Sequence, residues 1–270
     1  GAVYVDQGAA LMVEKSIFSG NEATFGGALY NVGNSSSITA VDTSFIGNKA
    51  VEEGSAIYNG KLISEVASTD EAGKATLKLQ NYNAYLVLKN VTISGHDSGI
   101  AGDKVATISN WGTMDAYNLT IANNGDAAIN NWAYDSVSEN ILDAEGNKIP
   151  FHFEAEMNLE HVTIAYNKAL GIDYGHSNII NSIVQDADNS NFVNLVTGGS
   201  FDNSVSAESV FAQNMVSDNG GWVYTLQLQS ASAAVNAIQS ASLTNYDARG
   251  FLVYGLRDLG AYESNAVVAI

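Results

Sequence analysis

The sequence predicts an all-β fold in which one chain winds as a parallel β-helix. Short motifs recur at nearly constant spacing, mostly 21 or 28 residues. Each repeat holds short runs of β-branched residues bounded by Gly and Asn, and no run of helical periodicity separates them. Strands that follow one another without a connecting helix can pair in parallel by stacking, one repeat unit on the next, at about 4.8 Å per unit.

The two halves of the repeat unit can be followed separately along the chain. The first half recurs at 90–94 and 118–122, and again at 161–165. The second half ends at an Asn, and counterparts of that Asn recur 28 or 21 positions on where no insertion intervenes. Asn tolerates left-handed corners, and stacked amides can hydrogen-bond at the unit spacing. We therefore predict two Asn columns, one with Asn21, Asn48, Asn124 and Asn167, in which His96 takes one place, and one with Asn31, Asn59, Asn110 and Asn131.

Two insertions interrupt the period, one near 60–84 and one near 133–157. Each has a hairpin-like centre, and each follows a residue of the same Asn column, Asn59 or Asn131. We therefore expect both to emerge from one edge of the stack, about 10 Å apart. This convergence is typical of a binding face, but surface turns also tolerate insertions that have no function.

We expect one domain, with β-helix repeats over 1–200 and the last coils and a C-terminal cap over 201–270. A cap is needed because an open terminal coil leaves an unpaired sheet edge. The chain has two Arg residues, both within this C-terminal part. We expect Arg249 and Arg257 to pair there with nearby carboxylates, namely Asp247, Asp258 or Glu263.

Composition and charge exclude several classes of partner. Among 270 residues there are 11 Lys and Arg against 29 Asp and Glu, a net charge of −18. Such a chain repels nucleic acid and anionic lipid. No apolar run reaches the roughly 20 residues that cross a bilayer. The first residues show no signal peptide. Because the chain starts in the middle of a strand-like pattern, we expect a fragment of a longer protein, attached to a membrane only through an anchor outside this fragment. The absence of Cys excludes disulfides.

Two sets of motifs resemble known bacterial proteins. Residues 26–31 read Gly-Gly-Ala-Leu-Tyr-Asn and follow Phe-Ser-Gly-Asn at 18–21. This pattern resembles the repeat of bacterial polymorphic outer-membrane proteins and related right-handed parallel β-helix surface proteins. Asp-Ala-Arg-Gly-Phe at 247–251 and Gly-Ala-Tyr-Glu at 260–263 are similar to a terminal motif of secreted, surface-anchored β-helix proteins. The resemblance implies a single-stranded right-handed parallel β-helix at the bacterial cell surface, outside the cell.

The leading functional hypothesis is an adhesin or passenger domain that binds a host or bacterial surface glycan or protein without catalysis. Aromatic residues beside the second Asn column could stack on sugar rings if they are exposed, or form part of the core if they are buried. With an acidic residue at the centre of the second insertion, the candidate ligand-binding residues are Tyr58, Trp111, Trp132, Tyr134 and Asp143.

Two alternatives remain open. Polysaccharide lyases and glycoside hydrolases also use solenoid faces, and they need paired acids and bases. The candidates for such catalysis are Glu154, Glu156, His161 and Asp173. A purely structural stalk is the other alternative. No cofactor is expected, with calcium as the open exception because acidic turns offer hard oxygen ligands.

Overall fold

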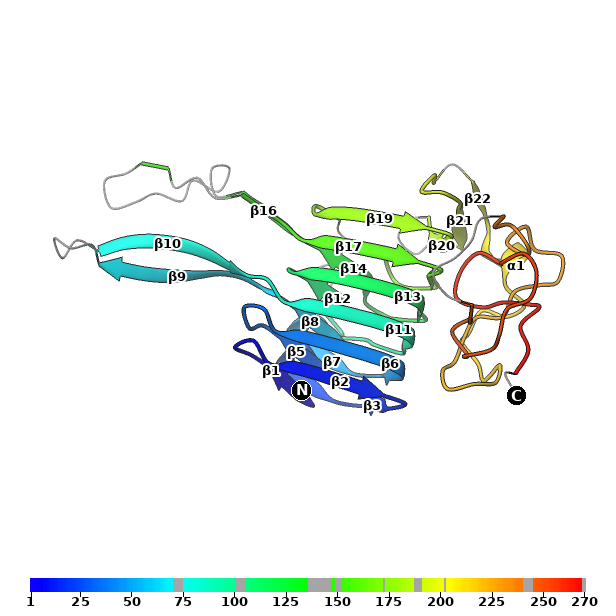
Figure 1. Ribbon diagram of the computed structural model, residues 1–270, viewed down its shortest axis with the longest axis horizontal. Coiled ribbons are helices and arrows are strands. Elements are labelled where there is room, and N and C mark those ends of the chain that lie inside the picture. Colours follow the sequence, from blue (N-terminus) through cyan, green and yellow to red (C-terminus); the bar gives the residue numbers. More distant parts are fainter. Residues whose placement is uncertain are drawn as a thin grey trace.

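The protein is built almost wholly of β-strands, most of them paired in parallel (Figure 1). The computed structural model describes residues 1–69, 75–100, 105–135, 147–148, 152–171, 173–186, 191–201, 203–239 and 245–268. Within these ranges the one helix is α1 (Ala207–Val210). The all-β prediction is confirmed.

Two parallel sheets form the body of the molecule, and successive repeat units contribute strands to each. The first sheet has the order β1 (Val3–Val5), β5 (Leu29–Asn31), β8 (Ile57–Asn59), β12 (Ala106–Asn110), β14 (Ala127–Asn131). The second sheet contains β2 (Ala10–Glu14), β3 (Ile17–Ser19), β6 (Ser37–Ile46), β11 (Tyr85–Ser94), β13 (Thr113–Ala122), β17 (Glu156–Glu160), β18 (Thr163–Ala165), β19 (His176–Ile180), β20 (Ser182–Gln185), β21 (Phe192–Val196) and β22 (Ser204–Ser206). In this sheet only the β20–β21 and β21–β22 pairs are antiparallel.

Three smaller pairs complete the strand list. Strands β4 (Glu22–Phe25) and β7 (Lys49–Glu53) are parallel and form a short third face. The other two pairs are antiparallel hairpins: β9 (Lys61–Thr69) with β10 (Ala75–Tyr82), and β15 (Ala133–Asp135) with β16 (His152–Glu154).

The register between units follows the repeat in the sequence. Thr92 of β11 pairs with Thr120 of β13, and Thr120 pairs with Thr163 of β18. Like residues therefore stack on like residues in the core, where one buried column holds Phe45, Ile93, Ile121 and Ile164. Such apolar columns exclude water from the space between the sheets, which is the main favourable contribution to folding.

A left-handed corner divides the long strands of the second sheet. Asn90, Asn118 and Asn181 have φ values of 54°, 54° and 53° there, and His161 has 55°. Other residue types with a Cβ rarely adopt this conformation, whereas Asn does so comparatively easily. Across the six units this corner column, which we call the left-handed corner, comprises Lys15, Asp42, Asn90, Asn118, His161 and Asn181.

The second predicted Asn column forms a continuous hydrogen-bonded ladder, which we call the Asn ladder. The Nδ2 of Asn31 donates to Oδ1 of Asn59 at 2.8 Å, Asn59 donates to Asn110 at 2.8 Å, and Asn110 donates to Asn131 at 2.8 Å. Asn131 then donates to Oδ1 of Asp173 at 3.1 Å. The four Asn side chains are fully buried, so the amides satisfy one another where water cannot reach.

The first predicted Asn column is also present, and His96 occupies one place in it. Asn124 donates to Oδ1 of Asn167 at 2.7 Å. The backbone N–H of His96 donates to Oδ1 of Asn124 at 3.0 Å, and its ring nitrogens lie 2.9 Å from the carbonyl of Asn48 and 3.0 Å from that of Phe45. Burial lowers the pKa of His96. The ring therefore replaces an Asn side chain as a structural hydrogen-bonding group.

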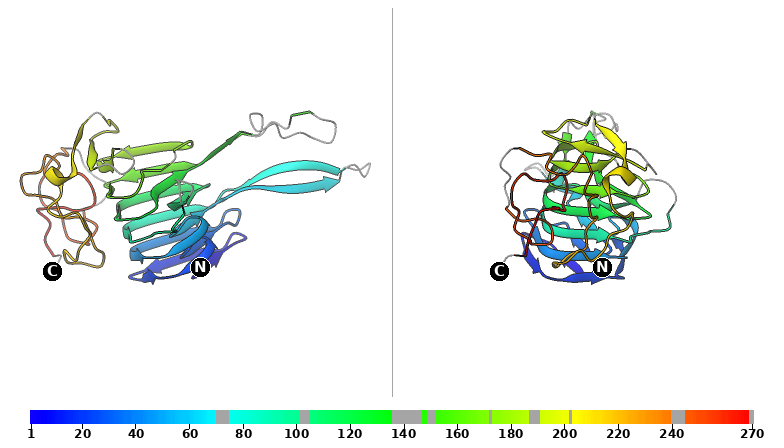
Figure 2. Two further views of the ribbon diagram at one scale, coloured as in Figure 1. Left: turned by 180° about the vertical axis from the view of Figure 1, so that it is seen from behind. Right: turned by 90° about the vertical axis from the view of Figure 1, so that its right-hand side faces the viewer.

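The C-terminal segment, residues 203–239 and 245–268, lies along the flank of the stack on the side of the left-handed corner (Figures 1 and 2). The Nζ of Lys15 lies 5.0 Å from the ring centroid of Trp222. Asn118 donates to the carbonyl of Tyr246 at 2.9 Å. The segment expected to form the last coils and cap therefore also contacts the stack as far as its first unit.

Substitution of Asn110 tests the Asn ladder. Asn110→Ala removes the acceptor for Asn59 and a donor to Asn131 in a buried column. We expect the free energy of unfolding to fall by about 2 to 4 kcal/mol, measured by urea denaturation. The control is Asn178→Ala, at an exposed Asn in β19, which we expect to change stability by less than about 0.5 kcal/mol. Equal losses in both variants would contradict a structural role of the ladder.

Candidate functional site

Both hairpins leave the stack at the same corner. At two places without a hairpin, two residues connect this column to the next strand: Trp111 and Gly112 between Asn110 and Thr113, and Tyr174 and Gly175 between Asp173 and His176. Tyr85 pairs with Thr113, which in turn pairs with Glu156. Each hairpin is therefore inserted between the two residues of such a corner.

We call β9–β10 arm 1 and β15–β16 arm 2. Arm 1 is inserted between Gly60 and Ala84, and arm 2 between Trp132 and Ala155. Their starting points, Asn59 and Asn131, are separated in the sheet by Asn110 alone. This corresponds to two strand spacings, or about 10 Å. Figure 1 shows both arms projecting from the side of the stack opposite the C-terminal segment.

An aromatic column fills the corner from which the arms project. The rings of Trp111 and Trp132 stack with their centroids 4.8 Å apart and an interplanar angle of 7°. The ring centroid of Tyr174 lies 6.4 Å from that of Trp132. The indole N–H of Trp111 donates to Oε2 of Glu53 at 3.0 Å, and that of Trp132 donates to Oγ of Ser109 at 3.0 Å. These bonds fix the orientation of both indoles.

Exposure separates the predicted aromatic residues into two groups. Tyr58 and Trp111 are only 6% and 7% exposed, so they pack as part of the protein interior. Burial beside Glu53 also raises the pKa of Tyr58. Trp132 and Tyr134 are half-buried, and Tyr174 is 65% exposed. The surface available for stacking at this corner is therefore offered by Trp132, Tyr134 and Tyr174.

Sequence reasoning missed Tyr174 as part of this aromatic set. It follows Asp173, which continues the Asn ladder as a carboxylate instead of an amide, and arm 2 obscures the spacing. The remaining predicted ligand-binding residue, Asp143, lies outside the described residues.

The predicted acids and bases are only partly brought together. Glu154 lies on arm 2 with its Oε1 3.2 Å from Nε2 of His152, and Glu156 begins β17 beside the same corner. Asp173 accepts hydrogen bonds from Asn131 and Ser177 at the end of the Asn ladder. These three carboxylates belong to the arm 2 corner.

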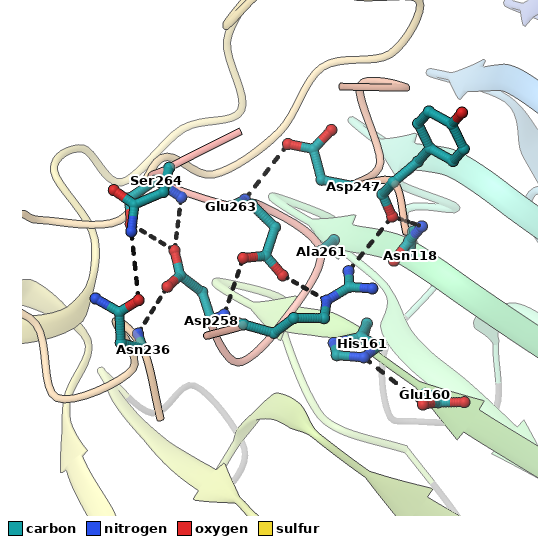
Figure 3. Close-up of polar contacts among 12 residues, drawn as sticks. Asn118, Glu160, His161, Asn236, Asp247, Asp258, Ala261, Glu263 and Ser264 are labelled. Carbon is teal, nitrogen blue, oxygen red and sulfur yellow. Dashed lines mark hydrogen bonds and ion pairs between the residues drawn. The ribbon is translucent and has the colours of Figure 1, made fainter. Parts of the chain in front are cut away.

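His161 lies away from these carboxylates, beyond the other end of β17. Its side chain is fully buried at the left-handed corner, and its Nε2 lies 3.6 Å from Oε1 of Glu160 (Figure 3). Burial is the main reason that the pKa of His161 falls to about 3, and the positive charge of Arg257 lowers it further. The imidazole is therefore neutral at ordinary pH.

Buried ion pairs organise the C-terminal segment, and Figure 3 shows the contacts around Glu263. The Nε of Arg249 donates to Oδ2 of Asp247 at 2.7 Å, and that of Arg257 donates to Oε1 of Glu263 at 2.7 Å. The expected pairing of both Arg residues with nearby carboxylates is confirmed for these two partners. Asp258 instead accepts hydrogen bonds from the backbone N–H groups of Asn236 and Ser264. Burial raises the pKa of Glu263 to about 7 against the opposing effect of Arg257.

The described residues contain neither a membrane-spanning helix nor a cluster of metal ligands. Among them no helix has the length and apolar character needed to cross a bilayer. In the same ranges, no group of three or more His, Asp or Glu side chains that could hold a metal ion is found. Calcium binding stays a prediction.

The comparisons with known proteins find one family. The repeat of the Chlamydia polymorphic membrane proteins matches residues 15–32 and 42–60. These segments include the ends of two successive units, β5 and β8, where the Asn ladder begins. No curated protein and no solved structure matches the chain. The repeat supports a bacterial surface or outer-membrane protein and hence a location at the cell surface.

A pH series on His161→Asn tests the buried neutral imidazole. Asn occupies the equivalent positions 90 and 118, so it suits the left-handed backbone. Since the folded pKa is lowered from 6.5 to about 3, the unfolded state binds the proton first as pH falls. Wild-type stability relative to the variant should therefore drop by roughly 2 kcal/mol between pH 7.5 and pH 5.

The measurement is urea denaturation of both proteins at the two pH values. Taking the difference between them cancels the opposite contribution of Glu263, whose raised pKa makes acidification stabilising. A difference that does not change with pH would contradict the neutral, buried state of His161.

Proposed function

We propose that this chain is the ligand-binding domain of a bacterial cell-surface protein, of the adhesin or passenger type. In this proposal it is a right-handed parallel β-helix that contacts a host or bacterial surface glycan or protein through the two arms, without catalysis. The observation that carries the proposal is that both arms leave one corner of the stack, two units apart, beside the stacked Trp111 and Trp132.

The rigidity of the stack and the reach of the arms support this proposal. The stack is a preorganised platform, because its corner is fixed by the Asn ladder and by the hydrogen bonds of both indoles. Arms mounted on such a platform reach away from it, so they meet a ligand first. The half-buried Trp132 and the exposed Tyr174 offer ring faces between the arms and the stack. Aromatic groups of this kind contribute strongly to binding when a partner covers them.

Removal of the arms tests the proposal. Deleting 61–83 leaves Gly60 and Ala84 between Asn59 and Tyr85, and deleting 133–154 leaves Trp132 and Ala155 between Asn131 and Glu156. Both deletions thus restore the two-residue corner seen at Trp111–Gly112. We expect loss of binding to host or bacterial cells in a cell-adhesion assay, with an unchanged β-rich circular dichroism spectrum.

Two point variants provide the control for this test. Trp132→Ala should reduce adhesion at least partly, whereas Met215→Ala, at an exposed residue on the opposite flank, should leave it unchanged. If the protein that lacks both arms folds and still adheres as well as the wild type, the binding face lies elsewhere.

A polysaccharide-cleaving enzyme is the second candidate. It is favoured by one observation, the exposed pair of His152 and Glu154 on arm 2 beside Glu156. Under our proposal, incubation with a panel of polysaccharides releases neither reducing sugar nor unsaturated product. Release that is abolished by Glu154→Gln would replace the adhesin proposal with this one.

A further inference from the structure

A cavity of about 700 Å³ is lined by residues of both the stack and the C-terminal segment. The C-terminal segment lies on the side of the stack opposite the arms (Figure 1). Three neighbouring units form one wall, with Lys15 and Asp42 at the left-handed corner and Lys89 beside it. The C-terminal segment forms the other wall, which includes Trp222, Tyr246 and Arg249. The volume falls within the range of small-ligand pockets.

Cationic side chains outnumber carboxylates among the residues that line this cavity. Three of the 11 Lys and Arg residues line it, against one carboxylate, although the chain carries a net charge of −18. Lys89 is exposed, and no ion pair of Lys89 is found among the described residues. The ammonium of Lys15 lies 3.4 Å from exposed Glu14 and 5.0 Å from the Trp222 ring. Cationic side chains so placed favour an anionic ligand.

Arg249 holds the second wall in place instead of reaching into solvent. Its guanidinium is bound to Asp247, to the carbonyl of Asn219 at 3.2 Å and to the carbonyl of Glu263 at 2.6 Å. It also stacks on the ring of Phe251, another residue of the wall, at 4.6 Å. Both sides of the cavity are therefore made before a ligand arrives, which lowers the entropic cost of binding.

Two further features restrict the chemistry of the ligand. The indole of Trp222 is 61% exposed and Tyr246 is partly exposed, so flat ring faces line the opening. Asp42 would repel a simple anion, but its carboxylate can accept hydrogen bonds from hydroxyl groups. Its Oδ1 already accepts Nδ2 of Asn90 at 2.8 Å, which fixes its orientation. A ligand that satisfies all these groups carries a carboxylate, hydroxyls and a face that stacks on aromatic rings.

We propose that this cavity binds an acidic sugar unit of a polysaccharide or glycan, with its carboxylate at Lys15 and Lys89, a hydroxyl at Asp42 and its ring face against Trp222. The site is separate from the arms, and it does not depend on the function proposed for them. Each ammonium would form a charge-assisted hydrogen bond with the sugar carboxylate.

Isothermal titration calorimetry tests the proposal with digalacturonate, a hyaluronan tetrasaccharide and sialyllactose as acidic probes, and lactose and cellobiose as neutral ones. We expect at least one acidic probe to bind, and to bind more weakly at higher salt. Lys89→Gln and Lys15→Gln should each weaken it about tenfold, and Trp222→Ala should weaken it as well. Lys49→Gln, at an exposed Lys of β7 outside the cavity, is the matched control and should leave the affinity unchanged.

Each other outcome overturns the proposal. The site is not an acidic-sugar site if no acidic probe binds at millimolar concentration, if neutral probes bind equally well, or if Lys49→Gln weakens binding as much as Lys89→Gln. Equal binding of inorganic phosphate or of a tetraglutamate peptide, with the same dependence on Lys89, would overturn the sugar assignment. The protein without arms should keep the affinity of the wild type, which separates this result from that of the adhesion assay.

Discussion

Hydrogen bonds between side-chain amides, repeated at the spacing of parallel strands, hold the corner on which the rest of the molecule is built. In the Asn ladder each Nδ2 donates to the Oδ1 of the next unit, and it also donates to backbone carbonyls. The Nδ2 of Asn110, for example, donates both to Oδ1 of Asn131 and to the carbonyl of Glu156. Because the ladder is fully buried, a break would leave polar atoms without water or protein partners. This constraint keeps the units in register and fixes where the two arms and the aromatic column begin.

The opposite flank depends on a different arrangement, in which the C-terminal segment lies across the left-handed corner. It covers the outer face of the second sheet, where Thr92 is fully buried and donates to the carbonyl of Tyr224. Its own shape is held by ion pairs of Arg249 and Arg257, whose carboxylate partners are buried with them. The stack thus has one flank that carries arms and one that is covered, and the cavity lined by Lys15 and Lys89 lies between the cover and the stack.

Much of the fold could be predicted because it is periodic. The positions of Asn59, Asn110 and Asn131 follow from repeat spacing, and the arms are visible as breaks in that spacing. The role of Asp173 could not be predicted in this way, because arm 2 lengthens its spacing from Asn131 to 42 residues and because the residue type changes. The path of the C-terminal segment along the stack could not be predicted either. Its contacts use backbone carbonyls such as that of Tyr246, which leave no pattern in the sequence. Nor does sequence distinguish buried Trp111 from half-buried Trp132, which occupy equivalent corner positions.

Asp173 gives the ladder a direction and a terminus. An amide both donates and accepts, so each Asn can accept from the preceding unit and donate to the next one. An ionised carboxylate only accepts. At Asp173 the donors are Nδ2 of Asn131 and Oγ of Ser177. No further unit could receive a hydrogen bond from this side chain in its ionised form. The change from amide to carboxylate at this position therefore ends the run of side-chain donors that begins at Asn31.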